Sequence, residues 1–191
     1  MIRVLASASP RRRDLIEAAG WAYEIFPVEH EERFDDEIPI LSTMTVAFEK
    51  ARLAAEKYRA KGLFLGCDTT VVGKSVYQKP KDIEDARRML EELSGGTHSV
   101  VSGFALIDAV HGLTFVDYDL SEVEFEPYGE MYEEYLKTSE WKDKAGAYGI
   151  QSPKVHFVRS YTGSLSNIIG LPMEKLREYL DDQGELKQFT P

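Results

Sequence analysis

The stretch LFLGCDTTVV, residues 63–72, is apolar at both ends and carries one charged residue, Asp68, near its centre. Such a run is typical of a strand that is buried on both faces in the middle of an α/β sheet. A buried carboxylate is costly unless it is paired, hydrogen-bonded or bound to a metal. The stretch therefore predicts a central strand that presents Asp68 to a functional site. A carboxylate that only caps a turn through Thr69 or Thr70 is the structural alternative.

Strands and helices alternate around this stretch, and a strand-rich region follows. Before it we expect strands at 2–6 and 23–28, a helix that begins at Pro10, and a long helix from Ser42 or Thr43 to Gly62. After it we expect helices at 82–96, 129–140 and 167–184, an antiparallel pair of strands at 97–109 and 112–127, and a further strand within 148–163. No linker-like segment divides the chain. This order predicts a single α/β domain with a mixed sheet over residues 1–191.

The charge balance limits the partners of the chain. Lys and Arg number 23 and Asp and Glu number 33, which gives a net charge of −10 over 191 residues. A field of this sign repels duplex nucleic acid and anionic membranes, so an anionic ligand needs a local basic pocket or a bound cation. The single cysteine, Cys67, excludes an internal disulfide, and no segment resembles a secretory signal or a membrane span. We therefore expect a cytoplasmic protein.

The N-terminal stretch LASASPRRR, residues 5–13, combines a strand end, a small-residue turn and the first turn of a helix. Ser9 is placed to cap that helix, and Ser7 adds a second hydroxyl. Cations at a helix N-terminus are opposed by the helix dipole, so consecutive arginines there indicate a bound anion. Arg11 and Arg12 carry planar forks that match phosphate oxygens. On these residues alone, phosphate binding and a solvated basic turn both remain open.

Other candidate residues each have a plain alternative. Lys50 and Lys79 fit surface lysines, Glu32 and its neighbour Glu31 fit a solvated acidic loop, and Gln151 fits a turn. The sequence has no phosphate-binding P-loop, dinucleotide-binding glycine motif, serine-hydrolase elbow or zinc-protease motif. What remains is basic groups for phosphates and a carboxylate for a metal or a water molecule.

Taken together, the chain resembles the Maf family of nucleoside triphosphate pyrophosphatases over nearly its whole length. The resemblance rests on six motifs in order: LASASPRRRDLIEAAG, the EE pair followed by AFEKA, GCDTTVV, QKPKDIEDARRMLEELSGGTHSVVSG, KAGAYGIQ, and GSLSNIIGLPME. It implies a fold similar to the inosine triphosphate pyrophosphatases, with an elongated mixed sheet, flanking helices and a cleft between two lobes. It also implies a homodimer, and metal-dependent hydrolysis between the α- and β-phosphates with Mg²⁺ or Mn²⁺.

The resemblance further assigns roles to individual residues. It gives phosphate binding to Ser7, Arg11 and Arg12. It gives catalysis to Asp68, Glu32, Lys50 and Lys79, with the metal on Asp68 and Glu32. Arg11, Thr69 and Gln151 match the branch of the family that acts on dTTP and UTP, and CTP is a further candidate substrate. Ser152-Pro153 stands where the family usually has glycine, and Cys67 where it often has alanine or serine.

Three alternatives remain open at this point. A branch of the family that acts on 7-methyl-GTP typically has glutamine after the aspartate and glutamate in place of the later glutamine. A nucleotidyl transferase would use the same basic loop with a sugar phosphate as nucleophile. A nucleotide-binding regulator of cell division, suggested by the family's association with septum inhibition, would bind a nucleotide without turning it over.

Overall fold

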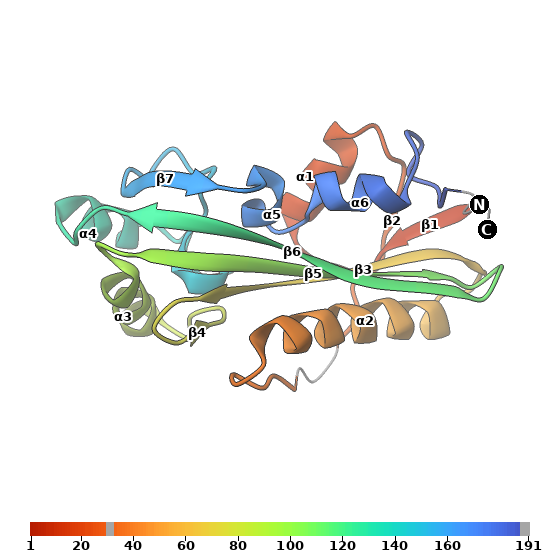
Figure 1. The fold of residues 1–191 in the computed structure, drawn as a ribbon, viewed down its shortest axis with the longest axis horizontal. Coiled ribbons are helices and arrows are strands. Elements are labelled where there is room, and N and C mark those ends of the chain that lie inside the picture. Colours follow the sequence, from red (N-terminus) through yellow and green to blue (C-terminus); the bar gives the residue numbers. More distant parts are fainter. Residues whose placement is uncertain (30–32, 188–191) are drawn as a thin grey trace.

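The computed structural model describes residues 1–29 and 33–187. Its centre is a mixed, seven-stranded sheet in the order β2-β1-β3-β5-β6-β7, with β4 paired to β3 (Figure 1). The strands are β1 (Ile2–Leu5), β2 (Glu24–Ile25), β3 (Gly62–Val72), β4 (Val76–Tyr77), β5 (Thr97–Asp108), β6 (Leu113–Phe125) and β7 (Val158–Thr162). The predicted mixed sheet flanked by helices is confirmed.

Strand β3 is the centre of this sheet, as the sequence predicts. It pairs in parallel with β1 and antiparallel with β5 and β4. Nearly every residue of β3 is buried, and Asp68 lies opposite Gly103 of β5. Because both faces are covered, the uninterrupted apolar pattern of the strand is explained.

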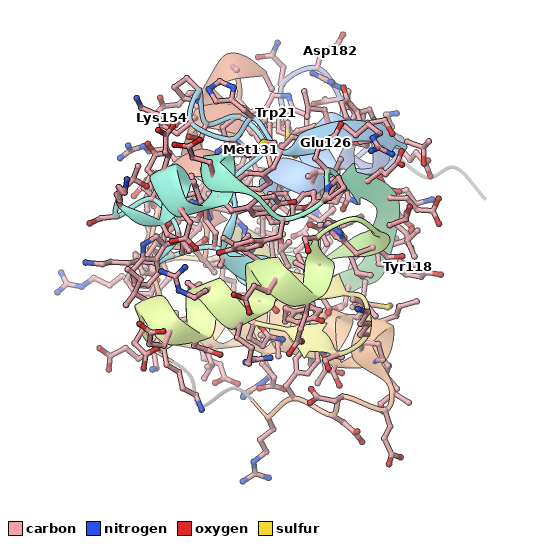
Figure 2. The ribbon with its side chains drawn as sticks, turned by 90° about the vertical axis from the view of Figure 1, so that its left-hand side faces the viewer. Trp21, Tyr118, Glu126, Met131, Lys154 and Asp182 are labelled. Carbon is pink, nitrogen blue, oxygen red and sulfur yellow. The ribbon has the colours of Figure 1, made fainter. Side chains whose placement is uncertain are left out.

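Helices cover both faces of the sheet. Helix α2 (Pro39–Lys57) packs on one face, and α1 (Pro10–Ala18), α5 (Leu165–Ile169) and α6 (Met173–Tyr179) lie on the other (Figure 1). Helices α3 (Ile83–Leu93) and α4 (Glu130–Leu136) lie near one end of the long sheet, and Figure 2 looks onto that end. A short 3₁₀ turn, η1, spans Ala145–Ala147. None of the helices within the described ranges is both long and apolar enough to cross a membrane.

The hydrophobic core has two large clusters toward opposite ends of the molecule and a smaller one around Phe64, between α2 and the sheet. One cluster joins β4, α3 and α4 around Tyr77, Phe125 and Tyr132, and a second joins β1, β3 and α6 around Leu65 and Phe104. Strands β3 and β5 run through both clusters, so the sheet connects the two ends.

Three expected elements differ from the structure. The strand expected at 23–28 is only β2, with two residues. The long helix starts at Pro39, because proline suits the first helical position and the Ser42 hydroxyl bonds the backbone of Asp35 instead of capping. It ends at Lys57 and not at Gly62, which is the first residue of β3. The closing helix is split into α5 and α6 by the segment 170–172, where Gly170 has φ of 127° and proline follows.

Two glycines allow α2 to lie directly on the sheet. A Cβ atom at Gly66 of β3 would lie 2.1 Å from the carbonyl oxygen of Ala47, and one at Gly103 of β5 would lie 2.9 Å from the amide nitrogen of Met44. Any side chain at these positions would therefore push α2 away from the strands. This close approach also decides where the side chains of α2 meet β3.

Candidate active site

A pocket of about 530 Å³ opens along β3, between the β1–α1 turn, α2 and the segment that follows α4. This volume lies in the range of small-molecule sites. With the exception of Glu32, which lies outside the described residues, every residue assigned to the site from the sequence lines this pocket: Ser7, Arg11, Arg12, Lys50, Asp68, Thr69, Lys79 and Gln151. The structure therefore brings together residues that are as far apart in the sequence as 7 and 151.

Lys50 of α2 and Asp68 of β3 form an ion pair inside the pocket. The Lys50 Nζ lies 2.8 Å from Asp68 Oδ1, and the two side chains are 14% and 10% exposed. Lys50 stands between Ala47 and Ala51, whose backbone atoms lie against Gly66. The interpretation of Lys50 as a plain surface lysine is therefore wrong, because the close packing of α2 on β3 directs it to the carboxylate.

The second oxygen of Asp68 has a different environment. Asp68 Oδ2 is buried, and it accepts no hydrogen bond from any part of the chain that the structure describes. A buried carboxylate oxygen without a donor calls for a ligand such as a cation or a water molecule. Mg²⁺ binds through one or two carboxylates together with substrate phosphates and keeps several waters. Asp68 therefore fits a cation site, although no group of three metal-ligating side chains gathers within residues 1–29 and 33–187.

Arg12 of α1 lines the pocket and forms the centre of a hydrogen-bond network. Its Nε donates to the Gly170 carbonyl at 2.8 Å, and Nη1 donates to the Cys67 carbonyl at 2.8 Å. Nη1 also donates to Ser7 Oγ and Nη2 to Thr69 Oγ1, each at 3.1 Å. An arginine has five N–H groups, so these contacts leave one for a ligand. Arg12 thus ties α1, β3 and the α5–α6 connection together, which its sequence position alone does not reveal.

The same network occupies the two hydroxyl groups that the sequence assigned to the substrate. Ser7 Oγ accepts from Arg12 and from the Ser9 amide at 3.2 Å. Thr69 Oγ1 accepts from Arg12 and lies 2.9 Å from Ser102 Oγ and 3.2 Å from the Gly170 carbonyl. Ser9 sits at the N-cap of α1 without a capping bond from its side chain, so the expected cap is wrong.

Replacing Arg12 should therefore affect the fold as well as ligand binding. Because lysine cannot donate in four directions from one plane, Arg12→Lys leaves the buried Cys67 carbonyl short of a donor. We expect a loss of about 1–3 kcal/mol in the free energy of unfolding, measured by urea denaturation. Arg13→Lys is the matched control: Arg13 is exposed, and its ion pairs with Asp14 and Glu17 are long, both at 3.8 Å. Equal stability of the two variants would contradict the framework role of Arg12.

Arg11 also lines the pocket but has different partners from Arg12, and the structure adds two residues there, Asp143 and Lys144, that the sequence did not single out. Arg11 Nη1 donates to Asp143 Oδ2 at 2.8 Å and Nη2 to the Asp143 carbonyl at 3.0 Å. Lys144 Nζ donates to Asp143 Oδ1 at 2.8 Å. Partial burial would raise the pKa of the Asp143 carboxyl, but the Lys144 hydrogen bond and the Arg11 charge lower it from its ordinary value. Asp143 and Lys144 belong to the segment KDKAGAYGIQ, residues 142–151, and no spacing rule in the sequence connects this segment to Arg11.

The remaining residues line the pocket without forming part of these networks. Lys79 and Gln151 are exposed, and Gln78 beside Lys79 donates to Thr70 Oγ1 at 3.1 Å. Cys67 is fully buried, and burial raises the pKa of its thiol, which is typical of an unreactive structural cysteine. The arrangement as a whole combines one buried carboxylate with several cationic side chains in the same pocket.

Comparison with known proteins shows the family of the chain. A family model described as "Maf-like protein" matches residues 3–183. A "dTTP/UTP pyrophosphatase" from Ruminiclostridium cellulolyticum is 39% identical over 186 residues, covering 95% of this chain and 96% of that protein. The proteins of the same name from Clostridioides difficile and Citrifermentans bemidjiense are 39% and 42% identical, with coverage of 97% and 96% on both sides.

Among solved structures, a HAM1 protein from Coxiella burnetii matches with a TM-score of 0.45 and 19% identity, over 68% of this chain and 76% of that chain. The family model covers nearly every residue of the chain, and the relatives share more than a third of their residues with it. The chain belongs to the Maf-like protein family.

Proposed function

We propose that this protein hydrolyses dTTP and UTP to the nucleoside monophosphate and pyrophosphate, with CTP as a further substrate. The observation that carries the proposal is the buried Asp68 carboxylate, which lies in a pocket lined by lysines and arginines. The relatives that bear the name dTTP/UTP pyrophosphatase support the substrate class. The resemblance to the family assigns Arg11, Thr69 and Gln151 to the branch that acts on pyrimidine nucleotides.

In this mechanism the carboxylate of Asp68 acts on the attacking water. Its Oδ2, which no described residue occupies, orients and deprotonates a water molecule that attacks the α-phosphorus. Lys50 donates to Asp68 Oδ1, so the Asp68 side chain keeps one orientation and the lysine balances the negative charge of the carboxylate. The leaving group is pyrophosphate, and the charge that develops on it is stabilised by the cationic side chains of the pocket, Lys50 and Lys79 among them.

A divalent cation, Mg²⁺ or Mn²⁺, would be held by Asp68 together with phosphate oxygens, and Glu32 is the second proposed ligand. When bound, the cation supplies charge neutralisation and polarises phosphate oxygens. Asp68 and Asp143 are the acidic residues of the described ranges that line the pocket, and both oxygens of Asp143 are paired with Arg11 and Lys144. Among the described carboxylates Asp68 is therefore the proposed ligand, which suits an ion that keeps most of its waters.

A pyrophosphate-release screen tests this proposal directly. We expect rapid release from dTTP and UTP with Mg²⁺ or Mn²⁺, and a loss of at least about 100-fold when the metal is chelated. The reaction should need no acceptor sugar phosphate, because water is the nucleophile. Release that appears only after an acceptor is added would instead indicate a nucleotidyl transferase.

The same screen separates the other two candidates. Preference for 7-methyl-GTP would overturn the pyrimidine assignment of Thr69 and Gln151 but keep the chemistry of Asp68. Nucleotide binding without any turnover would favour the cell-division regulator. Residence in the cytoplasm and a homodimer stay predictions, which fractionation and light scattering would test.

A further inference from the structure

Arg11 is anchored differently from the other cations of the pocket. Its two terminal nitrogens both donate to Asp143, one to the carboxylate and one to the backbone carbonyl, at 2.8 and 3.0 Å. Contact through both terminal nitrogens fixes the plane of the guanidinium, which a single hydrogen bond does not. Of the five N–H groups, three remain for a ligand.

Asp143 is itself fully engaged. Its Oδ2 accepts from Arg11 and its Oδ1 accepts from Lys144 at 2.8 Å. Lys144 also donates to the Glu140 carbonyl, so it is tied to the same segment. With both oxygens occupied by cations, the carboxylate is poorly placed to act as a base or a metal ligand. Its contribution to the pocket is the direction in which it holds Arg11.

The segment that holds Arg11 also carries Gln151. A Cβ atom at Gly149 would lie 2.6 Å from Lys144 Cε and 3.5 Å from Gln151 Oε1, so the Lys144 side chain and the Gln151 amide both lie next to Gly149. Asp68 and its partner Lys50 belong instead to β3 and α2. Arg11, which Asp143 orients, is therefore bound to the segment that carries the Gln151 amide. It is not bound to the Lys50–Asp68 pair, which acts on the reacting phosphate in the proposed mechanism.

We propose that Asp143 is a positioning residue that turns the Arg11 guanidinium toward the base of a bound nucleotide rather than toward its phosphates. This inference rests on the proposed function, because it requires a nucleotide in the pocket. A pyrimidine offers carbonyl oxygens as acceptors, and the remaining N–H groups of Arg11 are donors for them. The Gln151 amide, which both donates and accepts, completes the set of groups suited to a pyrimidine edge.

Because Asp143 is negatively charged, the proposal can be tested by whether removing it weakens or strengthens nucleotide binding. Removing a carboxylate from a pocket for a polyanion should by itself strengthen binding of any phosphate-bearing ligand. Loss of a positioned hydrogen-bond donor should weaken ligands that carry the base and spare those that do not. If Asp143 acts only as a repulsive charge, its removal should raise the affinity for a nucleotide. If it positions Arg11, its removal should lower that affinity.

The experiment is calorimetric titration of UMP and of inorganic pyrophosphate, with Mg²⁺, onto the wild-type chain, Asp143→Ala and Asp143→Asn. For Asp143→Ala we expect the Kd of UMP to rise about 3- to 10-fold, the loss of one well-placed hydrogen bond. The Kd of pyrophosphate should stay the same or fall. Asp143→Asn keeps an oxygen acceptor for Arg11, so its UMP affinity should lie between those of the other two.

Asp14→Ala is the matched control, because it removes an exposed carboxylate from the same helix as Arg11, and the ion pair of Asp14 with Arg13 is long, at 3.8 Å. It should leave both affinities unchanged. Unchanged or tighter UMP binding in Asp143→Ala would overturn the proposal, and so would equal weakening of UMP and pyrophosphate or a wild-type chain that binds no UMP. Turnover of UTP by the wild-type chain, measured in parallel, tests the proposed function separately.

Discussion

Asp68→Asn should lower kcat for dTTP and UTP by about 10²–10⁴-fold, the usual contribution of a positioned general base. The amide has nearly the shape of the carboxylate and can still accept the hydrogen bond from Lys50, so the pocket should keep its geometry. What it loses is the negative charge and the basic oxygen at Oδ2, which is buried and has no donor among the described residues.

Steady-state kinetics at saturating Mg²⁺, together with thermal unfolding, check this expectation. The matched control is Asp108→Asn on the neighbouring strand β5, where the carboxylate is also buried but pairs with His111, outside the pocket. That variant should keep kcat within about twofold, since Asp108 touches no group placed in the reaction. Near-wild-type turnover by Asp68→Asn would remove Asp68 from the mechanism and with it the main argument for hydrolysis at this site.

The site residues that could be predicted from the sequence are those that local structure disfavours at their positions. An aspartate within a buried strand and arginines at a helix N-terminus both contradict local preferences, and both lie in the pocket. The central strand was predictable from its composition, because an apolar run on both sides of the aspartate is typical of a strand covered on both faces. Local rules therefore located the residues, and the family resemblance supplied their roles.

The division of work between the two arginines could not be predicted. Arg11 and Arg12 are adjacent on α1, yet one is bound to Asp143 and the other to the carbonyls of Cys67 and Gly170. These partners lie between 55 and 158 residues away along the chain. A backbone carbonyl also carries no sequence signal, since every residue has one. The sequence therefore assigned phosphates to both arginines, whereas the structure commits most of the Arg12 guanidinium to the fold.

The partner of Lys50 could not be predicted from the sequence either. In the sequence Lys50 is one lysine on a helix with several alanines, which fits a surface position. Its partner becomes apparent only when α2 is laid on β3, and that contact depends on Gly66. A glycine in the middle of a strand usually marks a close approach of another backbone, but it does not reveal which one approaches.

Gly66→Ala should therefore reduce stability and activity together. The added methyl group would lie 2.1 Å from the Ala47 carbonyl oxygen and 2.6 Å from the Ala51 amide nitrogen, and both of these are backbone atoms that cannot turn aside. Helix α2 must move away from β3, at a cost of about 2–3 kcal/mol, in the upper part of the range for an overpacked core. Lys50 lies between these two alanines, so the movement also draws its ammonium away from Asp68. A displacement of about 1 Å at a reacting group can cost about 10²-fold in rate.

Urea denaturation and kcat for UTP, measured on the same preparation of Gly66→Ala, test the link between packing and the site. Gly96→Ala is the matched control, because its nearest neighbour to an added Cβ is the Leu93 carbonyl at 3.8 Å, which is ordinary contact. That variant should keep both its stability and its rate. A Gly66→Ala protein that loses stability but keeps full turnover would show that the Lys50–Asp68 pair does not depend on the seating of α2. Loss of both, with the control unchanged, would show that a glycine with no polar atom in its side chain sets the distance between the catalytic carboxylate and its lysine.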